Sequence, residues 1–442
     1  MRITPKKELS LFDSTCIIVG IIIGAGIYEN APTIAAGASG WAGVLGIWLV
    51  GGLVALAGAL CYAELATAYP YQGGDYVYLT RAYGRGTGHF FGWSQLAIIR
   101  PGDIALMVFV FARYAETLYK PFEGVQVLYA AAAVAVLTLI NVLGVKQGKW
   151  TQNLLTVIKT VGLLAIVIAG LAAPGASTAP AQPEKFEMGA FSLALILVMW
   201  TFGGWNEIAY VAAEVKRPQR NIFRAVVLGT AGVTALYLLV NVAFLHALGH
   251  AGLAASKAVA VDTLATLLPD AASRAISVLI CISALGAANG LIFTGARISY
   301  ALGSDHTVFR SLGKWHPRLG TPVGALVAQG GISLAIILAA RSFIDTIVYA
   351  APVFWLFLLA TALSLFVLRR KEPDTPRPHK VAGYPVTPII FCASCAFMAY
   401  SSITFALAKK RVGVIILLCV LAVGVLVYRL TEVRRARQRN AQ

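Results

Sequence analysis

Long apolar runs separated by short polar segments make up most of this chain of 442 residues. A helix needs roughly 20 apolar residues to cross a bilayer, and dividing the runs by that length predicts twelve crossings. We expect them at 11–38, 41–69, 88–118, 124–143, 151–172, 190–213, 223–247, 274–302, 322–340, 344–368, 385–407 and 412–429. The pattern therefore predicts an all-α integral membrane protein.

The first run is interrupted near its middle by Gly24-Ala25-Gly26. Backbone inside a bilayer must be hydrogen-bonded unless it lines a cavity within the protein, so these glycines indicate an unwound turn. Carbonyls ending at Ile23 would be partly negative, and amides from Ile27 onward would be partly positive. Such ends suit the ammonium and the carboxylate of a free amino acid. Alternatively, Gly20-x-x-x-Gly24 is only a close-packing face between helices.

The sixth run contains a second candidate break, Thr201-Phe202-Gly203-Gly204-Trp205-Asn206. Gly203 follows Gly24 by 179 residues. Interrupted crossings at corresponding places in two halves indicate a transporter site at the interface of an inverted repeat. Trp200 stands directly before this break, where an aromatic side chain either packs in the core or covers a ligand as a lid.

The formal net charge of +17 reflects membrane topology. Of the 36 Lys and Arg residues, 24 fall in segments on the same predicted side as the N-terminus, eight on the opposite side and four inside crossings. Cytoplasmic loops are enriched in basic residues, so both termini are predicted to be cytoplasmic. Binding to nucleic acid is not needed to explain the charge.

Few charges are predicted inside the membrane, and each needs a partner. Lys159 is the only charged residue of the fifth run; it either braces the carbonyls freed at Gly24 to Ile27 or links its charge state to conformation. Ser283 in the eighth run is a candidate hydroxyl partner for it. Arg100 and Asp103 are three residues apart, so we expect them to pair on one helix face.

Six motifs, spread from the first to the eighth run, resemble the amino acid-polyamine-organocation superfamily, in particular its L-amino-acid transporter branch. In chain order they are Gly20-Ile-Ile-Ile-Gly-Ala-Gly-Ile-Tyr28, Gly73-Gly-Asp-Tyr-Val-Tyr78, Ile99-Arg-Pro101, Phe202-Gly-Gly-Trp-Asn206, Glu214-Val-Lys-Arg-Pro218 and Asn289-Gly-Leu-Ile-Phe-Thr294. The resemblance implies a LeuT-type fold, with a 5+5 inverted repeat and two further helices. The chain would divide into an N-terminal segment (1–10), two five-helix repeats (11–172 and 173–369), helices eleven and twelve (370–430) and a basic cytoplasmic tail (431–442).

The resemblance also implies roles for individual residues. Trp200 matches the gating aromatic, Lys159 matches a lysine that replaces a sodium ion, and Ser283 matches the hydroxyl near that lysine. The residues that would hold the substrate are Ile23, Gly24, Ala25, Gly26, Ile27, Phe202, Gly203 and Asn206.

Two departures from the branch stand out. Animal exchangers of this branch bond a heavy chain through a cysteine between the third and fourth crossings, whereas the segment 119–126 has none, so we expect a subunit without a disulfide-linked partner. Glu29, Asp103 and Glu207 place acids where the branch commonly has neutral residues, and these could favour a cationic substrate.

The leading interpretation is sodium-independent exchange of neutral L-amino acids across the plasma membrane by alternating access. Proton-coupled symport and exchange of cationic amino acids or polyamines are the alternatives. A substrate-sensing receptor is disfavoured because no soluble signalling domain is evident in the sequence. An enzyme is disfavoured because the sequence has no Gly-x-Ser-x-Gly or His-Glu-x-x-His motif. We expect no cofactor and no metal site.

Overall fold

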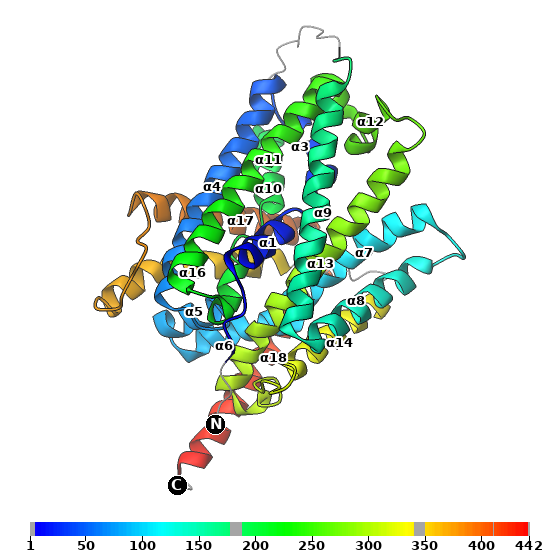
Figure 1. The fold of residues 1–442 in the computed structure, drawn as a ribbon. Coiled ribbons are helices and arrows are strands. Elements are labelled where there is room, and N and C mark those ends of the chain that lie inside the picture. Colours follow the sequence, from blue (N-terminus) through cyan, green and yellow to red (C-terminus); the bar gives the residue numbers. More distant parts are fainter. Residues whose placement is uncertain (1–4, 177–187, 340–349, 410, 441–442) are drawn as a thin grey trace.

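The computed structural model describes residues 5–176, 188–339, 350–409 and 411–440, and the regular structure within these ranges is helical (Figure 1). In chain order the elements are α1 (Leu11–Ile22), α2 (Gly26–Glu29), α3 (Ala31–Ala36), α4 (Gly40–Ala68), α5 (Asp75–Tyr83), α6 (Arg85–Ser94), the π-helix η1 (Gln95–Ile99), α7 (Arg100–Leu118), α8 (Val125–Leu143), α9 (Val145–Ala172), α10 (Met188–Thr201), the 3₁₀ helix η2 (Glu207–Glu214), α11 (Pro218–Ala255), α12 (Val259–Ala265), α13 (Ala272–Asp305), the 3₁₀ turn η3 (Thr307–Phe309), α14 (Val323–Ala339), α16 (Ala350–Lys371), α17 (Val386–Lys409) and α18 (Arg411–Asn440).

Nine helical stretches within the described ranges are long and apolar enough to cross a bilayer. Two further apolar helices, Ala190–Thr201 and Val323–Ala339, are shorter. The prediction of an all-helical membrane protein is therefore confirmed. The count of twelve crossings and the division into two five-helix repeats stay predictions, and parts of the ninth and tenth expected crossings fall outside the described residues.

Helix α1 lies inside the bundle, against α9, α11 and α13 (Figure 1). Its first turn is fixed by a reciprocal cap. The Ser10 hydroxyl accepts a hydrogen bond from the Asp13 backbone N–H at 3.2 Å, and the Asp13 carboxylate accepts one from the Ser10 backbone N–H at 2.8 Å. The helix therefore begins at a defined residue, which sets the depth at which it ends.

Gly20 and Gly24 have different surroundings. A Cβ on Gly20 would lie 2.2 Å from Gln152 Nε2 and 2.3 Å from Thr156 Oγ1, so Gly20 is needed for the close approach of α1 and α9. A Cβ on Gly24 would meet nothing closer than Met107 Sδ, at 3.9 Å. Close packing therefore accounts for Gly20, whereas neither a close contact nor a positive φ requires a glycine at Gly24.

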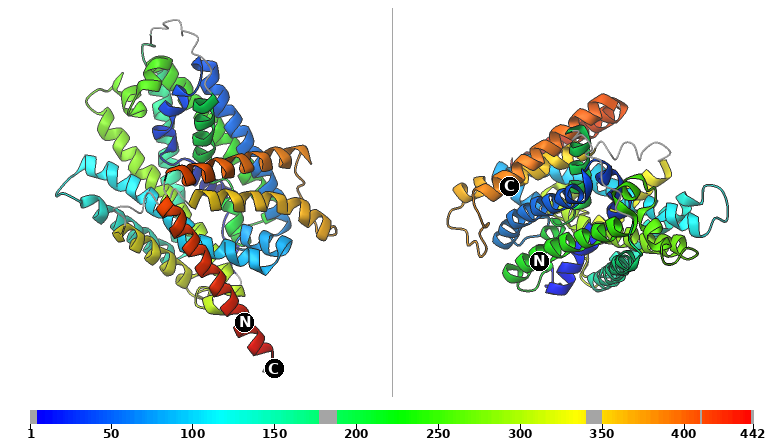
Figure 2. Two further views of the ribbon diagram at one scale, coloured as in Figure 1. Left: turned by 180° about the vertical axis from the view of Figure 1, so that it is seen from behind. Right: turned by 90° about the horizontal axis from the view of Figure 1, so that it is seen from above.

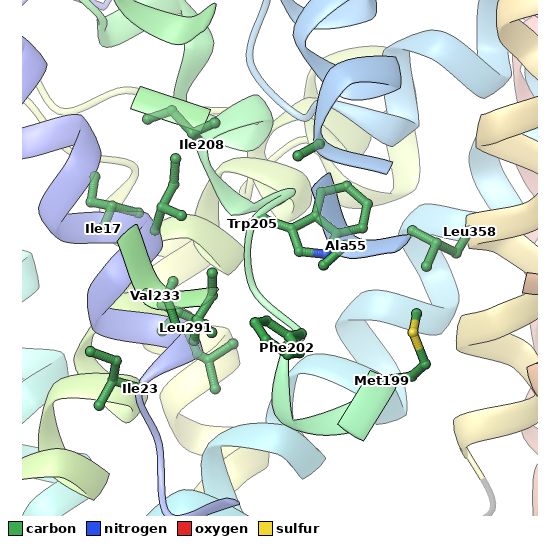
Figure 3. Close-up of a cluster of buried hydrophobic side chains, with 14 of the residues drawn as sticks. Ile17, Ile23, Ala55, Met199, Phe202, Trp205, Ile208, Val233, Leu291 and Leu358 are labelled. Carbon is green, nitrogen blue, oxygen red and sulfur yellow. The ribbon is translucent and has the colours of Figure 1, made fainter. Parts of the chain in front are cut away.

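Buried apolar side chains hold the two predicted breaks in the core (Figure 3). Ile23 and Phe202 are fully buried, and Trp205 is nearly so. The ring of Phe202 packs against Trp48 of α4 and Tyr237 of α11, with centroids 6.0 and 5.3 Å apart. The irregular segments are thus held in place by their buried side chains where the helical backbone ends.

The chain leading into α1 and the last turns of α18 lie at the same end of the molecule (Figures 1 and 2). A chain with an even number of crossings has its two ends on one side of the membrane. The arrangement is therefore compatible with the predicted topology.

Candidate functional site

The first crossing is broken where the glycines predict it. Helix α1 ends at Ile22, Ile23 to Ala25 are not helical, and α2 begins at Gly26. Ile23 has φ −74° and ψ 79°, which turns the chain out of the helix. The carbonyls released by this turn are partly satisfied by side chains, because Tyr237 Oη donates to Ile22 O at 2.9 Å.

Lys159 of α9 binds the carboxyl end of α1. Its side chain is fully buried, and its ammonium donates to the carbonyl oxygens of Gly20, of Ile23 at 2.8 Å and of Ser283 at 3.3 Å. The expectation that Lys159 contacts carbonyls between Gly24 and Ile27 is therefore wrong. The contacts lie earlier in the chain because the partial negative charge of a helix gathers on its last carbonyls.

Ser283 of α13 contributes in two ways. Its hydroxyl donates to the carbonyl oxygens of Ile23 at 2.9 Å and Gly24 at 3.2 Å, while its own backbone carbonyl accepts from Lys159. Ser283, the candidate hydroxyl partner of Lys159, therefore lies beside the ammonium but binds it through its backbone carbonyl, while its hydroxyl donates to the same carbonyl of Ile23 as the ammonium does. Together, Lys159 and Ser283 donate hydrogen bonds to the carbonyl oxygens at the end of α1.

The sixth expected crossing is also broken at the predicted place. Helix α10 ends at Thr201, residues 202–206 form turns, and the chain continues as η2. Gly204 has φ +123°, a conformation that residues with a Cβ rarely adopt. A Cβ there would also lie 2.7 Å from Ile21 Cγ2, so Gly204 lets this turn lie directly against α1.

The two breaks are in contact with each other. A Cβ on Gly26 would lie 2.9 Å from Thr201 Oγ1, and Asn30 Nδ2 donates to that same hydroxyl at 3.0 Å. The structure therefore brings the predicted residues at the first break beside Phe202 and Gly203. Trp200, the residue before Thr201 in α10, is 41% exposed and is thus accessible at the edge of this region.

Asn206 lies at the second break but is already engaged. Its side-chain amide donates to Tyr210 Oη at 3.1 Å, and that hydroxyl donates to the Asp75 carboxylate at 2.7 Å. All three side chains are buried. Asn206 therefore anchors the turn to α5 in this conformation.

A buried ion pair lies directly after the second break, at the start of η2. Arg100 Nη1 is 3.0 Å from both carboxylate oxygens of Glu207, and the Thr294 hydroxyl donates to the same carboxylate. The side chains of Arg100 and Glu207 are 4% and 6% exposed. The expected pairing of Arg100 with Asp103 is therefore wrong: the guanidinium reaches across to η2 and leaves Asp103 without an ion pair among the described residues.

Comparison with known proteins gives these contacts a context. Residues 9–427 match the model of the "Amino acid permease" family. The chain is 34% identical to the "b(0,+)-type amino acid transporter 1" of Mus musculus, over 90% of this chain and 83% of that protein. It is 31% identical to the "Large neutral amino acids transporter small subunit 2" of Homo sapiens, over 96% and 80% of the two chains. It is also 30% identical to the "Serine/threonine exchanger SteT" of Bacillus subtilis, over 90% and 91%.

The chain belongs to the amino acid permease family. The permease is accordingly a membrane transporter and not an enzyme. Within the described residues, no three His, Cys, Asp or Glu side chains gather in a way that would hold a metal ion.

At the end of the permease where α1 begins, the segments before α1 and after η2 are joined through their backbones. The amides of Glu8 and Leu9 donate to the Glu214 carbonyl at 2.8 and 2.9 Å, and the Lys216 amide donates to the Leu9 carbonyl at 2.8 Å. The Glu214 carboxylate binds Arg297 of α13 through two bonds, at 2.8 and 2.9 Å, and both side chains are almost completely buried. These bonds close this end of the molecule by joining the segment before α1, the end of η2 and α13.

Some of these residues could not be selected from the sequence. The partner of Ile22, Tyr237, lies in an ordinary apolar run and carries no local signal. Glu214 begins one motif and Arg297 lies three residues after another, but their 83-residue separation gives no indication that they meet.

Proposed function

We propose that this permease exchanges amino acids, chiefly neutral L-amino acids, across the plasma membrane by alternating access and without sodium. The observation that carries the proposal is the contact between two interrupted helices, 171 residues apart at Asn30 and Thr201. Twelve crossings in a LeuT-type arrangement, with a 5+5 inverted repeat and both termini cytoplasmic, would place this contact at the interface of the two repeats.

The substrate would bind at the breaks. Ile23, Gly24, Ala25, Gly26 and Ile27 would take the carboxylate through their amides and, with Phe202 and Gly203, the ammonium through their carbonyls. Within the described part of the chain, the amides of Gly26 and Ile27 begin a helix and have no acceptor inside it. Asn206 would add a polar contact once it leaves Tyr210. Free backbone donors at the membrane centre support a carboxylate-bearing substrate.

Lys159 would replace the sodium ion of related transporters. A fully buried ammonium that donates to carbonyl oxygens of α1 and α13 already supplies the positive charge that a bound sodium would bring. Trp200, exposed beside the second break, would close over the substrate as the outer lid.

Exchange and symport are separated by reconstitution into liposomes. Uptake of labelled amino acid is expected when unlabelled amino acid is present inside, and to be absent from empty liposomes even when a pH gradient is imposed. Uptake into empty liposomes driven by the gradient would instead establish proton-coupled symport.

Asp103 favours cationic amino acids as a second candidate substrate class. Of the three unusual acids, Glu207 is bound to Arg100 and Glu29 is bound to Arg113, so their charges are compensated. Asp103 is only partly buried and forms no ion pair among the described residues. Its neighbour one turn along α7, Met107, faces Gly24, so this side of α7 faces the first break.

The Asp103→Asn variant tests this substrate class. If the carboxylate binds a cationic side chain, the variant loses exchange of lysine and arginine while it retains exchange of serine and leucine. Glu29→Gln is the matched control, because it removes a charge that Arg113 already compensates. Wild-type protein that exchanges neutral substrates alone would exclude the cationic class and leave neutral exchange as the function.

The permease would act without a disulfide-linked heavy chain. No cysteine lies in the segment 119–126 between α7 and α8. Exchange by the purified chain, reconstituted without other proteins, is the expected result.

A further inference from the structure

A basic cavity lies where the chain enters α1 and α11. It has a volume of about 400 Å³ and is lined by Ser10, Leu11, Lys216, Arg217, Arg220, Asn221 and Arg224. Four of these seven residues carry a positive charge and none carries a negative one. The cavity is open to its surroundings and its four cations are exposed, and such a group of cations without a counterion favours an anionic ligand.

These four cations differ from the arginines that bind buried glutamates elsewhere in the molecule. Arg100, Arg297 and Arg369 each bind a buried glutamate, whereas Lys216, Arg217, Arg220 and Arg224 form no ion pair within the described residues. A second basic cavity, of about 460 Å³, is lined by Arg369, Arg377 and Lys380, but there Glu64 compensates the first two. Uncompensated charge therefore distinguishes the first cavity.

The backbone around the cavity is also unusual. Apart from the glycines, Arg217 is the only described residue with a positive φ, at 49°. A side chain in this left-handed conformation costs free energy that the surrounding structure must supply. The turn brings Lys216 and Arg217 to the start of α11, beside Arg220.

The lipid-facing side of α11 leads directly into the cavity. Arg220, Arg224 and Leu228 are spaced four residues apart and share one helix face. Leu228 and Leu239, three turns further on, are 57% and 47% exposed on a helix that crosses the membrane. A cationic cavity next to an exposed apolar helix face is complementary to a molecule that has an anionic headgroup and acyl chains.

We infer that this cavity binds the phosphate headgroup of an anionic phospholipid from the leaflet on the N-terminal side of the membrane. Basic pockets at the cytoplasmic ends of crossings commonly hold such headgroups. The assignment to the cytoplasmic leaflet rests on the proposed function, in which both termini are cytoplasmic. Because the ligand would touch both the start of α1 and the start of α11, it would stabilise the closed end at which Lys216 meets Leu9.

The test uses the purified full chain in mixed micelles, titrated with phosphatidylglycerol, with phosphatidylcholine or with inorganic phosphate, while its melting temperature is followed. Phosphatidylglycerol is expected to raise the melting temperature, whereas the other two leave it unchanged. The triple variant Lys216→Gln/Arg220→Gln/Arg224→Gln keeps Arg217, so the left-handed turn is undisturbed. Each lost cation is expected to weaken binding about five-fold, or on the order of 100-fold in all.

The matched control is Arg310→Gln/Lys314→Gln/Arg318→Gln. It removes three exposed cations that lie on the same predicted side but do not line this cavity. The control should keep the wild-type response. An equal loss in both triple variants, an unchanged response in the first, or an equal shift with inorganic phosphate would each overturn the assignment.

Native mass spectrometry gives a second measurement that does not depend on melting. Wild-type protein and the control are expected to retain phosphatidylglycerol, and the cavity variant is expected to lose it. Neither readout uses transport, so a failure here is distinct from a failure of the proposed exchange activity.

Discussion

Replacing Lys159 with alanine should destabilise the first break and slow the exchange of amino acids. The substitution removes the donor to Gly20 O and to Ile23 O. Ile23 O keeps the hydroxyl of Ser283 at 2.9 Å, but Gly20 O loses its side-chain donor. A buried carbonyl without a partner costs about 1–3 kcal/mol, which reduces the population of the ordered break about 5- to 150-fold.

The assay is exchange of labelled amino acid in liposomes that contain unlabelled substrate, with the melting temperature measured in parallel. Exchange by Lys159→Ala is expected to fall at least about five-fold, the lower bound of the population change. Lys146→Ala is the matched control, because Lys146 lies on the same helix and is exposed. If Lys159→Ala exchanges at the wild-type rate, the ammonium has no part in transport and the reasoning fails.

Three further predictions concern stability. Glu207→Gln leaves Arg100 as an uncompensated buried charge, so unfolding should become easier by about 3–5 kcal/mol and the melting temperature should fall. Gly204→Ala forces a Cβ into a backbone with φ +123° and against α1, which should cost about 1–3 kcal/mol, measured in the same way. The hydrogen bond from Arg81 holds the pKa of Glu372 below its ordinary 4.5. That stabilisation is present above pH 4.5 and is lost as the pH falls through the lowered pKa, so Arg81→Gln should melt earlier than wild type at pH 6 and converge with it in acid.

Matched substitutions separate these effects from general damage. Glu29→Gln removes a carboxylate from a more exposed pair and should change stability far less than Glu207→Gln. Gly232→Ala introduces a Cβ into open space within α11, so it should not destabilise the permease. Equal losses within either pair of variants would contradict the burial and close-packing arguments.

The breaks could be predicted because their causes are local. Gly26 and Gly204 lack the Cβ that would oppose a turn or a close approach, and that absence can be read one residue at a time. The buried Lys159 was equally visible, since one ammonium in an apolar run must find oxygen partners. Both features appear in the structure.

The partners could not be predicted, because they depend on packing between distant elements. Arg100 and Asp103 are neighbours on α7, yet the guanidinium binds Glu207 across the interface with η2. Lys159 bonds Ser283 at its backbone carbonyl, while the serine hydroxyl and the ammonium both donate to the carbonyl of Ile23. The spacing of residues in the sequence predicts which side chains share one face of a helix. Ion pairing also depends on which helices pack against that face.

The backbone link from Leu9 to Val215 and Lys216 has a consequence for any movement of the two broken helices. The lead-in to α1 and the exit from η2 are fastened to one another, so neither broken helix can swing inward alone without rupturing that seam. Either the two helices move together as one rigid body, or the seam must be released before this end of the molecule can open.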